Sequence, residues 1–436
     1  VSTYTTKLTK DIDFYGGIDF RAYKGTHRNE IVDLYGGQYF IDSTRKTVKA
    51  ADNSAAANPE WAYEKLGVGD AVYRNFDGHV VQEGAFFQTE YSKNGLSAFV
   101  SGSLSNTSYW RYDRLFYDKQ HAKSDTKSYL GFTVKGGANY NLTDQHNVFF
   151  NAGFISRAPK FNYGAFLNPM KSNVTNPNAK NEKVVSLELG YGYRLKWLNV
   201  NLNGYWTKWL DKTMTKSATL GTSQTEAFVN MTGVNALHKG VELEVKANPL
   251  YWLELNGMLS VGDWKWDSNA TGLVYDYYGQ PLAKDGSIAS GVGADDHVAT
   301  SIKLKGVRVG GSAQTTAALG ATVKLGKQIR LGADWTYYGR NYAYYSLSGS
   351  NLSLGKTTTV VDPWKIPAAS QVDVNASYKF KIAGLNSTIS ANVNNLFDYQ
   401  YIGKAWNPQS GVANEETIYG YYSFGRTFST RLKINF

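Results

Sequence analysis

The stretch FGRTFSTRLKINF at residues 424–436 decides the fold, because it alternates between mostly apolar and wholly polar or small positions. Phe428, Leu432, Ile434 and Phe436 fall on even positions, whereas the odd positions carry only polar residues and glycine. This period of two is that of a β-strand with two different faces. A soluble β-sandwich can contain such a strand, but a chain end that frays in water rarely finishes on an aromatic residue. A transmembrane β-barrel places the apolar face against lipid and the terminal aromatic in the interfacial girdle, so the barrel is favoured.

The same alternation recurs along the chain and predicts an all-β fold. We expect a partial strand at residues 1–7 and roughly fourteen full strands after it. The full strands are expected at residues 11–23, 78–92, 95–110, 127–141, 146–157, 184–194, 198–213, 225–248, 251–266, 312–325, 328–342, 370–381, 386–398 and from 418 onward.

The connections between these strands alternate in length. Short turns are expected near residues 144, 196, 249, 326 and 384, and Asn94-Gly95 is a strong hairpin signal. Long connections are expected at residues 24–77, 111–126, 158–183, 267–311, 343–369 and 399–417. Outer-membrane barrels have short periplasmic turns and long external loops, so the alternation predicts an antiparallel transmembrane β-barrel with every long connection outside the cell.

Composition narrows the function classes. The chain has no cysteine, which excludes disulfides, thiolate metal sites and thiol nucleophiles. Aromatic residues make up 14% of the chain, as suits membrane interfaces, while its apolar runs are too short for a spanning helix. The net charge of +10 comes from scattered Lys and Arg, so we expect no nucleic-acid partner. These charges either contact lipopolysaccharide phosphates outside or an anionic ligand inside, or they are simply solvated. No signal peptide is visible at the start, which indicates a mature or truncated chain.

Several short motifs carry a resemblance to a known family. NNLFD at residues 394–398, Tyr401-Ile402 and GRTF at 425–428 resemble the C-terminal end of TonB-dependent outer-membrane receptors. Further motifs follow that family's order, namely GIDFR at 17–21, DLYGG at 33–37, SRAP at 156–159, NE at 181–182, SLELG at 186–190 and GVELE at 240–244. Plugged outer-membrane transporters have about 22 strands. The resemblance therefore implies that residues 1–436 are the C-terminal portion of such a barrel, without the plug domain, the TonB box or the first strands.

The resemblance also implies a function and partners. Receptors of this family bind a ligand from outside, and the TonB complex of the inner membrane pulls on the plug to open a path. The motif variant at residues 394–402 resembles receptors for iron chelates, haem and cobalamin, and the lumen charges Lys379, Arg431 and Lys433 would suit an anionic chelate. An oligosaccharide importer beneath a surface lipoprotein, or a passive porin or structural barrel, remains an alternative. The family's terminal aromatic resembles a signal for the barrel-assembly machinery, here Phe436 with Phe428 and Leu432.

The candidate binding residues are aromatic and basic. Tyr344, Tyr345 and Trp364 lie in an expected outer loop, where flat rings can hold a chelate, a tetrapyrrole or a sugar, although an aromatic girdle would use the same residue types. Tyr23, His27 and Arg28 form a second candidate at an outer strand end, with a solvated loop as the alternative.

No catalytic residue, cofactor or metal site is expected. The six histidines are widely separated, and no nucleotide-binding, hydrolase or metalloprotease motif accompanies them. Asp295-Asp296-His297 could ligate a metal but is expected to be solvated in its Gly-rich loop.

Overall fold

A computed structural model describes residues 1–42, 63–220, 225–276, 278–344, 355–360, 362–408 and 413–435, and the fold is all-β. No helix in the described part of the chain is long and apolar enough to cross a membrane.

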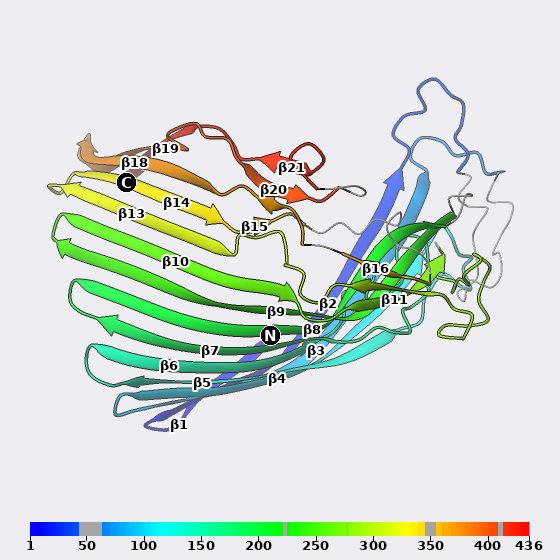
Figure 1. Cartoon of the computed structure of the whole chain (residues 1–436), viewed down its shortest axis with the longest axis horizontal. Coiled ribbons are helices and arrows are strands. Elements are labelled where there is room, and N and C mark those ends of the chain that lie inside the picture. Colours follow the sequence, from blue (N-terminus) through cyan, green and yellow to red (C-terminus); the bar gives the residue numbers. More distant parts are fainter. Residues whose placement is uncertain are drawn as a thin grey trace.

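One large sheet forms the wall of the molecule (Figure 1). Its long strands are β1 (Ser2–Thr9), β2 (Ile12–Glu30), β3 (Ala71–Lys93), β4 (Leu96–Asp113), β5 (Lys127–Asn141), β6 (His146–Arg157), β7 (Glu182–Arg194), β8 (Leu198–Leu220), β9 (Thr225–Leu250), β10 (Leu253–Trp266), β13 (Thr315–Leu325), β14 (Ile329–Gly339), β18 (Ala369–Ile382), β19 (Leu385–Asn394) and β22 (Thr427–Asn435). Each of them pairs antiparallel with the next in this order. The predicted antiparallel all-β fold is therefore confirmed.

Short strands extend the wall and brace its loops. They are β11 (Ala270–Asp276), β12 (Ala299–Lys303), β15 (Asn341–Tyr342), β16 (Thr357–Thr359), β17 (Lys365–Ile366), β20 (Ile402–Trp406) and β21 (Tyr419–Tyr422). β11 pairs with the outer part of β9, and β12 pairs parallel with β16. β11, β12, β16, β17 and β20 lie in stretches that the sequence predicts to be loops. The strand expected at residues 328–342 is divided into β14 and β15, and the strand expected from residue 418 is divided into β21 and β22. Local sequence does not predict the short strands, because each of them forms only by pairing with a segment that is distant in sequence or lies across a long loop.

The two faces of the wall differ as the alternation predicts. A row across β6 to β10 joins Phe150, Leu189, Gly204, Val241 and Val261 on one face. Large apolar side chains are exposed on this face, which therefore meets lipid. Polar residues occupy the opposite face and line the lumen, among them Asp13, Glu90, Glu188, Glu242 and Glu244.

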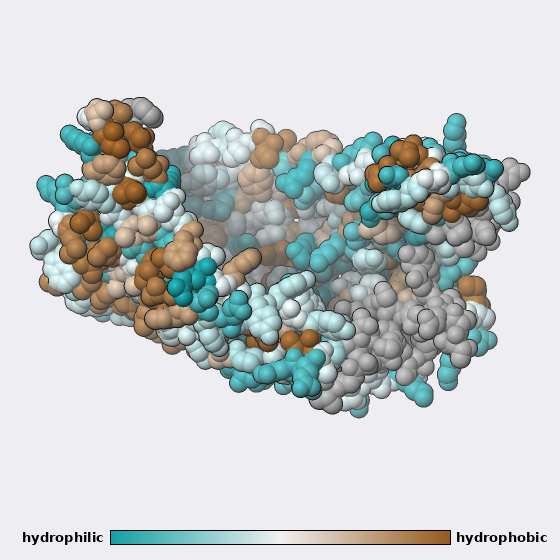
Figure 2. Space-filling view, turned by 90° about the horizontal axis from the view of Figure 1, so that it is seen from above, coloured by the Kyte–Doolittle hydropathy of each residue, from teal (hydrophilic) through white to brown (hydrophobic). Residues whose placement is uncertain are grey.

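Within the described residues, β1 pairs only with β2 and β22 pairs only with β19, so the wall is a trough with two edges. Figure 2 looks down on the trough and shows the hollow along it. Several strands continue beyond the lipid-facing band. β3, for example, has 23 residues, whereas about 9 to 11 cross a bilayer.

Candidate ligand-binding site

The connection between β6 and β7 folds inward over the lumen, and we call residues 158–181 the mouth loop. Tyr109 of β4 donates its hydroxyl to the carbonyl of Pro159 at 3.0 Å, and Phe161 packs against Tyr109 and Phe166. On the other side of the trough, Asn230 of β9 donates to the carbonyl of Tyr163 at 3.1 Å. The mouth loop thus bridges β4 and β9 and partly covers the hollow from the outer side.

Arg111 of β4 fastens the mouth loop to the wall. Its side chain is fully buried and donates from Nε to the carbonyl of Pro169 at 2.7 Å, from Nη1 to Oδ1 of Asn173 at 2.7 Å and from Nη2 to Oδ2 of Asp113 at 2.6 Å. The guanidinium also lies over the ring of Phe76, 4.2 Å from its centroid. Each of the three guanidinium nitrogens makes a structural hydrogen bond and the side chain is fully buried, so Arg111 has a structural role.

The first predicted group divides between the two faces of β2. Tyr23 and His27 lie on the lumen face, because they occupy odd-numbered positions of β2, as the lumen-facing Asp13 does. The ring of His27 stacks on Phe76 at 4.7 Å between centroids. Arg28 lies on the opposite face, where it donates to the carbonyl of Gly69 at 2.7 Å and pairs with Glu30 at 3.1 Å. Tyr23 and His27 can therefore face one ligand, whereas Arg28 points away from it.

The second predicted group meets at a corner built by β15, β17, β20 and β21. Tyr344 stacks on Trp406 with 5.6 Å between ring centroids and 21° between planes. Tyr421 meets Trp406 edge to face at 5.5 Å, and Nζ of Lys404 lies 4.8 Å from the ring centroids of both Tyr344 and Trp406. We call Tyr344, Trp406, Tyr421 and Lys404 the aromatic platform.

Backbone hydrogen bonds hold the aromatic platform in place. The amide of Tyr344 donates to the carbonyl of Ala405 at 2.7 Å, and the amide of Asn407 donates back to the carbonyl of Tyr344 at 3.0 Å. The predicted residue Trp364 packs beside the platform against Ile366 and Ala405, so the structure brings it close to Tyr344. Tyr345 lies outside the described residues.

A column of three tyrosines lies next to the aromatic platform along the chain. Tyr401 stacks on Tyr338 and on Tyr399, with 6.2 Å between centroids in each pair. Tyr338 shares the lumen face of β14 with Asp334, whereas its neighbour Tyr337 faces lipid. The Tyr337-Tyr338 pair therefore serves both predicted uses of aromatic residues, one ring in the girdle and one facing the lumen.

An ion cluster stabilises the outer end of β3, beyond the lipid-facing band. Asp77 lies opposite Thr26, which is six residues past the lipid-facing Phe20. The carboxylate of Asp77 accepts hydrogen bonds from Thr26 Oγ1 at 2.8 Å, from Lys24 Nζ at 2.9 Å and from Arg114. Burial alone would raise the pKa of Asp77, but the hydrogen bonds and charges of Arg114, Lys24 and Thr26 outweigh burial and hold the pKa below its usual value of 3.8. Asp77 is thus ionised and anchors the loop that begins at Arg114.

The candidate metal motif has a structural role in the described residues. Nδ1 of His297 accepts from the amide of Gly293 at 2.9 Å, and Nε2 donates to the carbonyl of Val274 at 2.8 Å. Asp296 accepts from the amide and hydroxyl of Ser290 at 2.8 Å and 2.7 Å. Both nitrogens of His297 are occupied, and no group of three or more possible metal ligands occurs in the described part of the chain.

The last strands carry the remaining predicted residues. Phe428 and Leu432 lie on the lipid face of β22, opposite Val393 and Ile389, while Phe436 is outside the described residues. Lys379, Arg431 and Lys433 lie on the lumen face, where Lys379 and Lys433 flank Thr388 of β19. The sequence interpretation missed Tyr421 and Lys404 as platform residues. Lys404 lies in a stretch expected to be a loop and Tyr421 at the start of the strand expected from residue 418, and only the pairing of β20 with β21 brings them together.

Comparisons with known proteins agree with this architecture. The family model described as TonB dependent receptor-like, beta-barrel matches residues 2–396. A search of curated protein sequences finds no match. Among solved structures, the copper transporter OprC is similar at 17% identity and a TM-score of 0.64, over 100% of this chain and 56% of that one.

Two receptors for ferric compounds are similar in the same way. The ferric yersiniabactin uptake receptor FyuA from Yersinia pestis has 13% identity and a TM-score of 0.59, with 100% of this chain and 53% of that chain covered. The ferric-catecholate import receptor Fiu from E. coli K12 has 15% identity and a TM-score of 0.58, with 99% and 53% covered. The chain spans about half the length of these relatives. By the family model and the shared fold, this chain belongs to the β-barrel family of TonB-dependent receptors of the Gram-negative outer membrane.

Proposed function

We propose that residues 1–436 form the C-terminal portion of a receptor barrel that imports a scarce nutrient by TonB-coupled gating. The two sheet edges at β1 and β22 and the half-length coverage of the relatives support a larger wall. In this proposal the TonB complex acts through a plug domain, and the barrel-assembly machinery inserts the chain. The lipid-facing wall contacts outer-membrane lipid and lipopolysaccharide.

The proposed ligand is a metal chelate or tetrapyrrole, such as an iron chelate, haem or cobalamin. The aromatic platform carries this proposal, because Lys404 lies 4.8 Å from two stacked rings and can pair with an anionic group while those rings pack on a flat surface. Tyr421 is 68% exposed, so much of its surface is open to a ligand. The similar structures include a copper transporter and receptors for ferric catecholate and ferric yersiniabactin, which supports this class.

An oligosaccharide is the second candidate. The column of Tyr338, Tyr401 and Tyr399 favours it, since stacked tyrosines present flat faces and hydroxyls to sugar rings without needing a charge. A surface lipoprotein would then be an expected partner.

Binding titrations of the complete receptor against ferric tris-catecholate, ferric citrate, haemin, cyanocobalamin and maltoheptaose test the proposal. Trp406→Ala should weaken binding of the true ligand about fivefold, as expected for losing ~1 kcal/mol of stacking. Trp110→Ala is the matched control, because Trp110 stacks on His79 on the outward face of the wall, at 4.8 Å.

Lys404→Gln separates the two ligand classes. It should weaken binding of an anionic chelate and leave binding of neutral maltoheptaose unchanged, since only the chelate pairs with the ammonium. Saturable binding of maltoheptaose alone would exclude the metal chelate. Ligand-independent permeation through the complete receptor without TonB would instead favour a passive porin.

A further inference from the structure

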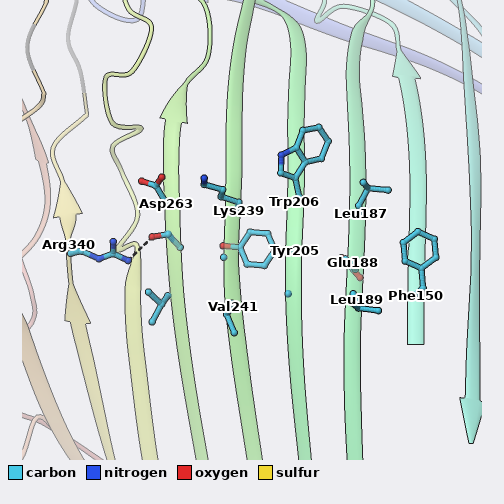
Figure 3. A pocket seen from close by; sticks show the side chains of 14 residues that line it. Phe150, Leu187, Glu188, Leu189, Tyr205, Trp206, Lys239, Val241, Asp263 and Arg340 are labelled. Atoms are coloured by element: carbon cyan, nitrogen blue, oxygen red, sulfur yellow. Dashed lines mark hydrogen bonds between the residues drawn. The ribbon is translucent and has the colours of Figure 1, made fainter. Parts of the chain in front are cut away.

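A furrow on the lipid-facing surface crosses β7 to β10 (Figure 3). Its volume is about 670 Å³, and its apolar lining includes Leu187, Leu189, Gly204, Trp206, Val241 and Val261. The furrow exists because Gly204 has no side chain between Leu189 and Val241 in the row across the wall. A Cβ added at Gly204 would meet no heavy atom nearer than 3.8 Å, so the space above this residue is open.

A second furrow of about 340 Å³ continues the first along β9 and β10. It starts at Leu243 and Leu259, the next lipid-facing residues after Val241 and Val261, and its lining includes Gly257. From Val241 to Ala247 the two furrows follow about 20 Å of strand, at ~3.3 Å per residue. For a strand tilted by about 45°, this length covers ~14 Å along the membrane normal, close to half of a 30 Å hydrocarbon core. The combined furrow therefore has the length of one acyl chain in one leaflet.

The position of Lys239 identifies the leaflet. Lys239 stands next to Trp206 at the upper end of the furrow, eleven residues from the periplasmic end of β9 at Leu250. Eleven residues of tilted strand rise about 25 Å, which is the height of the apolar band of an outer-membrane barrel. The furrow thus begins at the outer interface and runs toward the bilayer centre.

Basic residues gather around this end of the furrow. Lys265 and Arg308 each pair with Asp263 at 3.2 Å, Lys208 pairs with Asp267 at 2.6 Å, and Arg308 also approaches Asp362 at 3.8 Å. Arg340 donates to the carbonyl of Gly262 at 2.6 Å, as the dashed line in Figure 3 shows, and keeps its charge.

Lys239 has no ion pair with any residue in the described part of the chain, and Figure 3 shows it beside Asp263 at the end of the furrow. Five cations gather at this end of the furrow, namely Lys208, Lys239, Lys265, Arg308 and Arg340. The three carboxylates beside them are Asp263, Asp267 and Asp362, so the cations are in excess by two. An anion placed here would meet the ammonium of Lys239, whose neighbouring carboxylate Asp263 is already paired with Lys265 and Arg308, and a net positive field.

We propose that this combined furrow is a binding site for the phosphorylated lipid of the outer leaflet. One acyl chain lies along Gly204 and Gly257, and a headgroup phosphate pairs with Lys239. The apolar lining provides area for the chain, and the excess positive charge selects a phosphate at the interface. This site is separate from the ligand-binding mouth and does not depend on the proposed uptake function.

Native mass spectrometry of the complete receptor, after exchange from micelles containing bisphosphorylated lipid A, tests the site. The wild-type receptor should retain lipid A, and Gly204→Trp should lower the retained fraction at least fivefold by filling the furrow. Gly136→Trp is the matched control, because Gly136 is a lipid-facing glycine on β5, away from the furrow. Heat-modifiable migration on gels confirms that both variants are folded.

Lys239→Gln tests the headgroup without changing the furrow, and should lower lipid A retention about threefold. Lys119→Gln changes an exposed lysine of the loop after β4 and should leave lipid A retention unchanged. Phosphatidylglycerol and phosphatidylcholine are offered in parallel, and both should be retained less than lipid A. Equal retention by Gly204→Trp and Gly136→Trp, or equal retention of phosphatidylcholine and lipid A, would overturn the proposal.

Discussion

At the residue scale, Arg111 shows how a single buried cation determines the shape of the mouth. Its partners in the mouth loop, Pro169 and Asn173, are 58 and 62 residues away in sequence. Nothing in the local pattern around Arg111 distinguishes it from a lumen-facing arginine, so this role could not be predicted from the sequence. By contrast, alternation alone predicted which face Phe428 and Leu432 occupy.

Arg111→Lys should loosen the mouth loop. Lysine keeps the charge but lacks the fork that bonds Pro169, Asn173 and Asp113 together, and losing one such bond costs on the order of 2 kcal/mol. Hydrogen exchange of residues 158–181 should therefore accelerate about thirtyfold. Arg330→Lys, at a partly exposed pair with Glu254 outside the mouth loop, is the control and should change little. Unchanged protection in Arg111→Lys would contradict the anchoring role.

Asp77 makes the outer end of β3 sensitive to acid. Because the pKa of Asp77 is lower in the folded protein than its usual 3.8, its contribution is fully present above that value and is lost as the pH falls further. Hydrogen exchange of residues 114–126, corrected for its intrinsic pH dependence, should stay constant from pH 7 to about 4 and then rise. Asp77→Asn should show fast exchange already at pH 7. Glu83→Gln, at an exposed carboxylate on the same face, should resemble the wild type.

At the element scale, the long strands were predictable because each one alternates over a full membrane crossing. The short strands were not, since β11 needs the outer part of β9 as its partner and β16 pairs parallel with β12. The aromatic platform could not be predicted either, because it also depends on tertiary pairing. Tyr344, Trp406 and Tyr421 come from three separate segments, and only tertiary pairing of β20 with β21 brings the rings together.

The last strand should direct assembly through its lipid-facing aromatics. Phe436→Asp should lower the outer-membrane level of the receptor at least fivefold, because the terminal aromatic is proposed to be recognised by the assembly machinery. Lys433→Asn should leave the level nearly unchanged, since Lys433 lies on the lumen face of β22. Quantitative immunoblots of outer-membrane fractions measure both variants, and equal levels would count against recognition of Phe436.

At the scale of the whole molecule, the order of the long strands and the alternation of short turns with long connections followed from the sequence. The curvature of the trough and the inward fold of residues 158–181 did not, because both depend on contacts across the hollow, such as Asn230 with Tyr163. The sequence could therefore predict the strands of the wall and their connections, but not the shape of the mouth.

The two edges of the trough lead to the last prediction. In the described residues β1 bonds only β2 and β22 bonds only β19, so each edge presents backbone groups without partners to lipid. Each unsatisfied group in hydrocarbon costs several kcal/mol, which no side chain on an edge strand can offset. Residues 1–436 refolded alone into vesicles should therefore give neither heat-resistant migration on gels nor a uniform conductance. The complete receptor, refolded in the same vesicles, should give heat-resistant migration. A stable pore of uniform conductance from residues 1–436, with β1 hydrogen-bonded to β22, would show that the trough closes on itself.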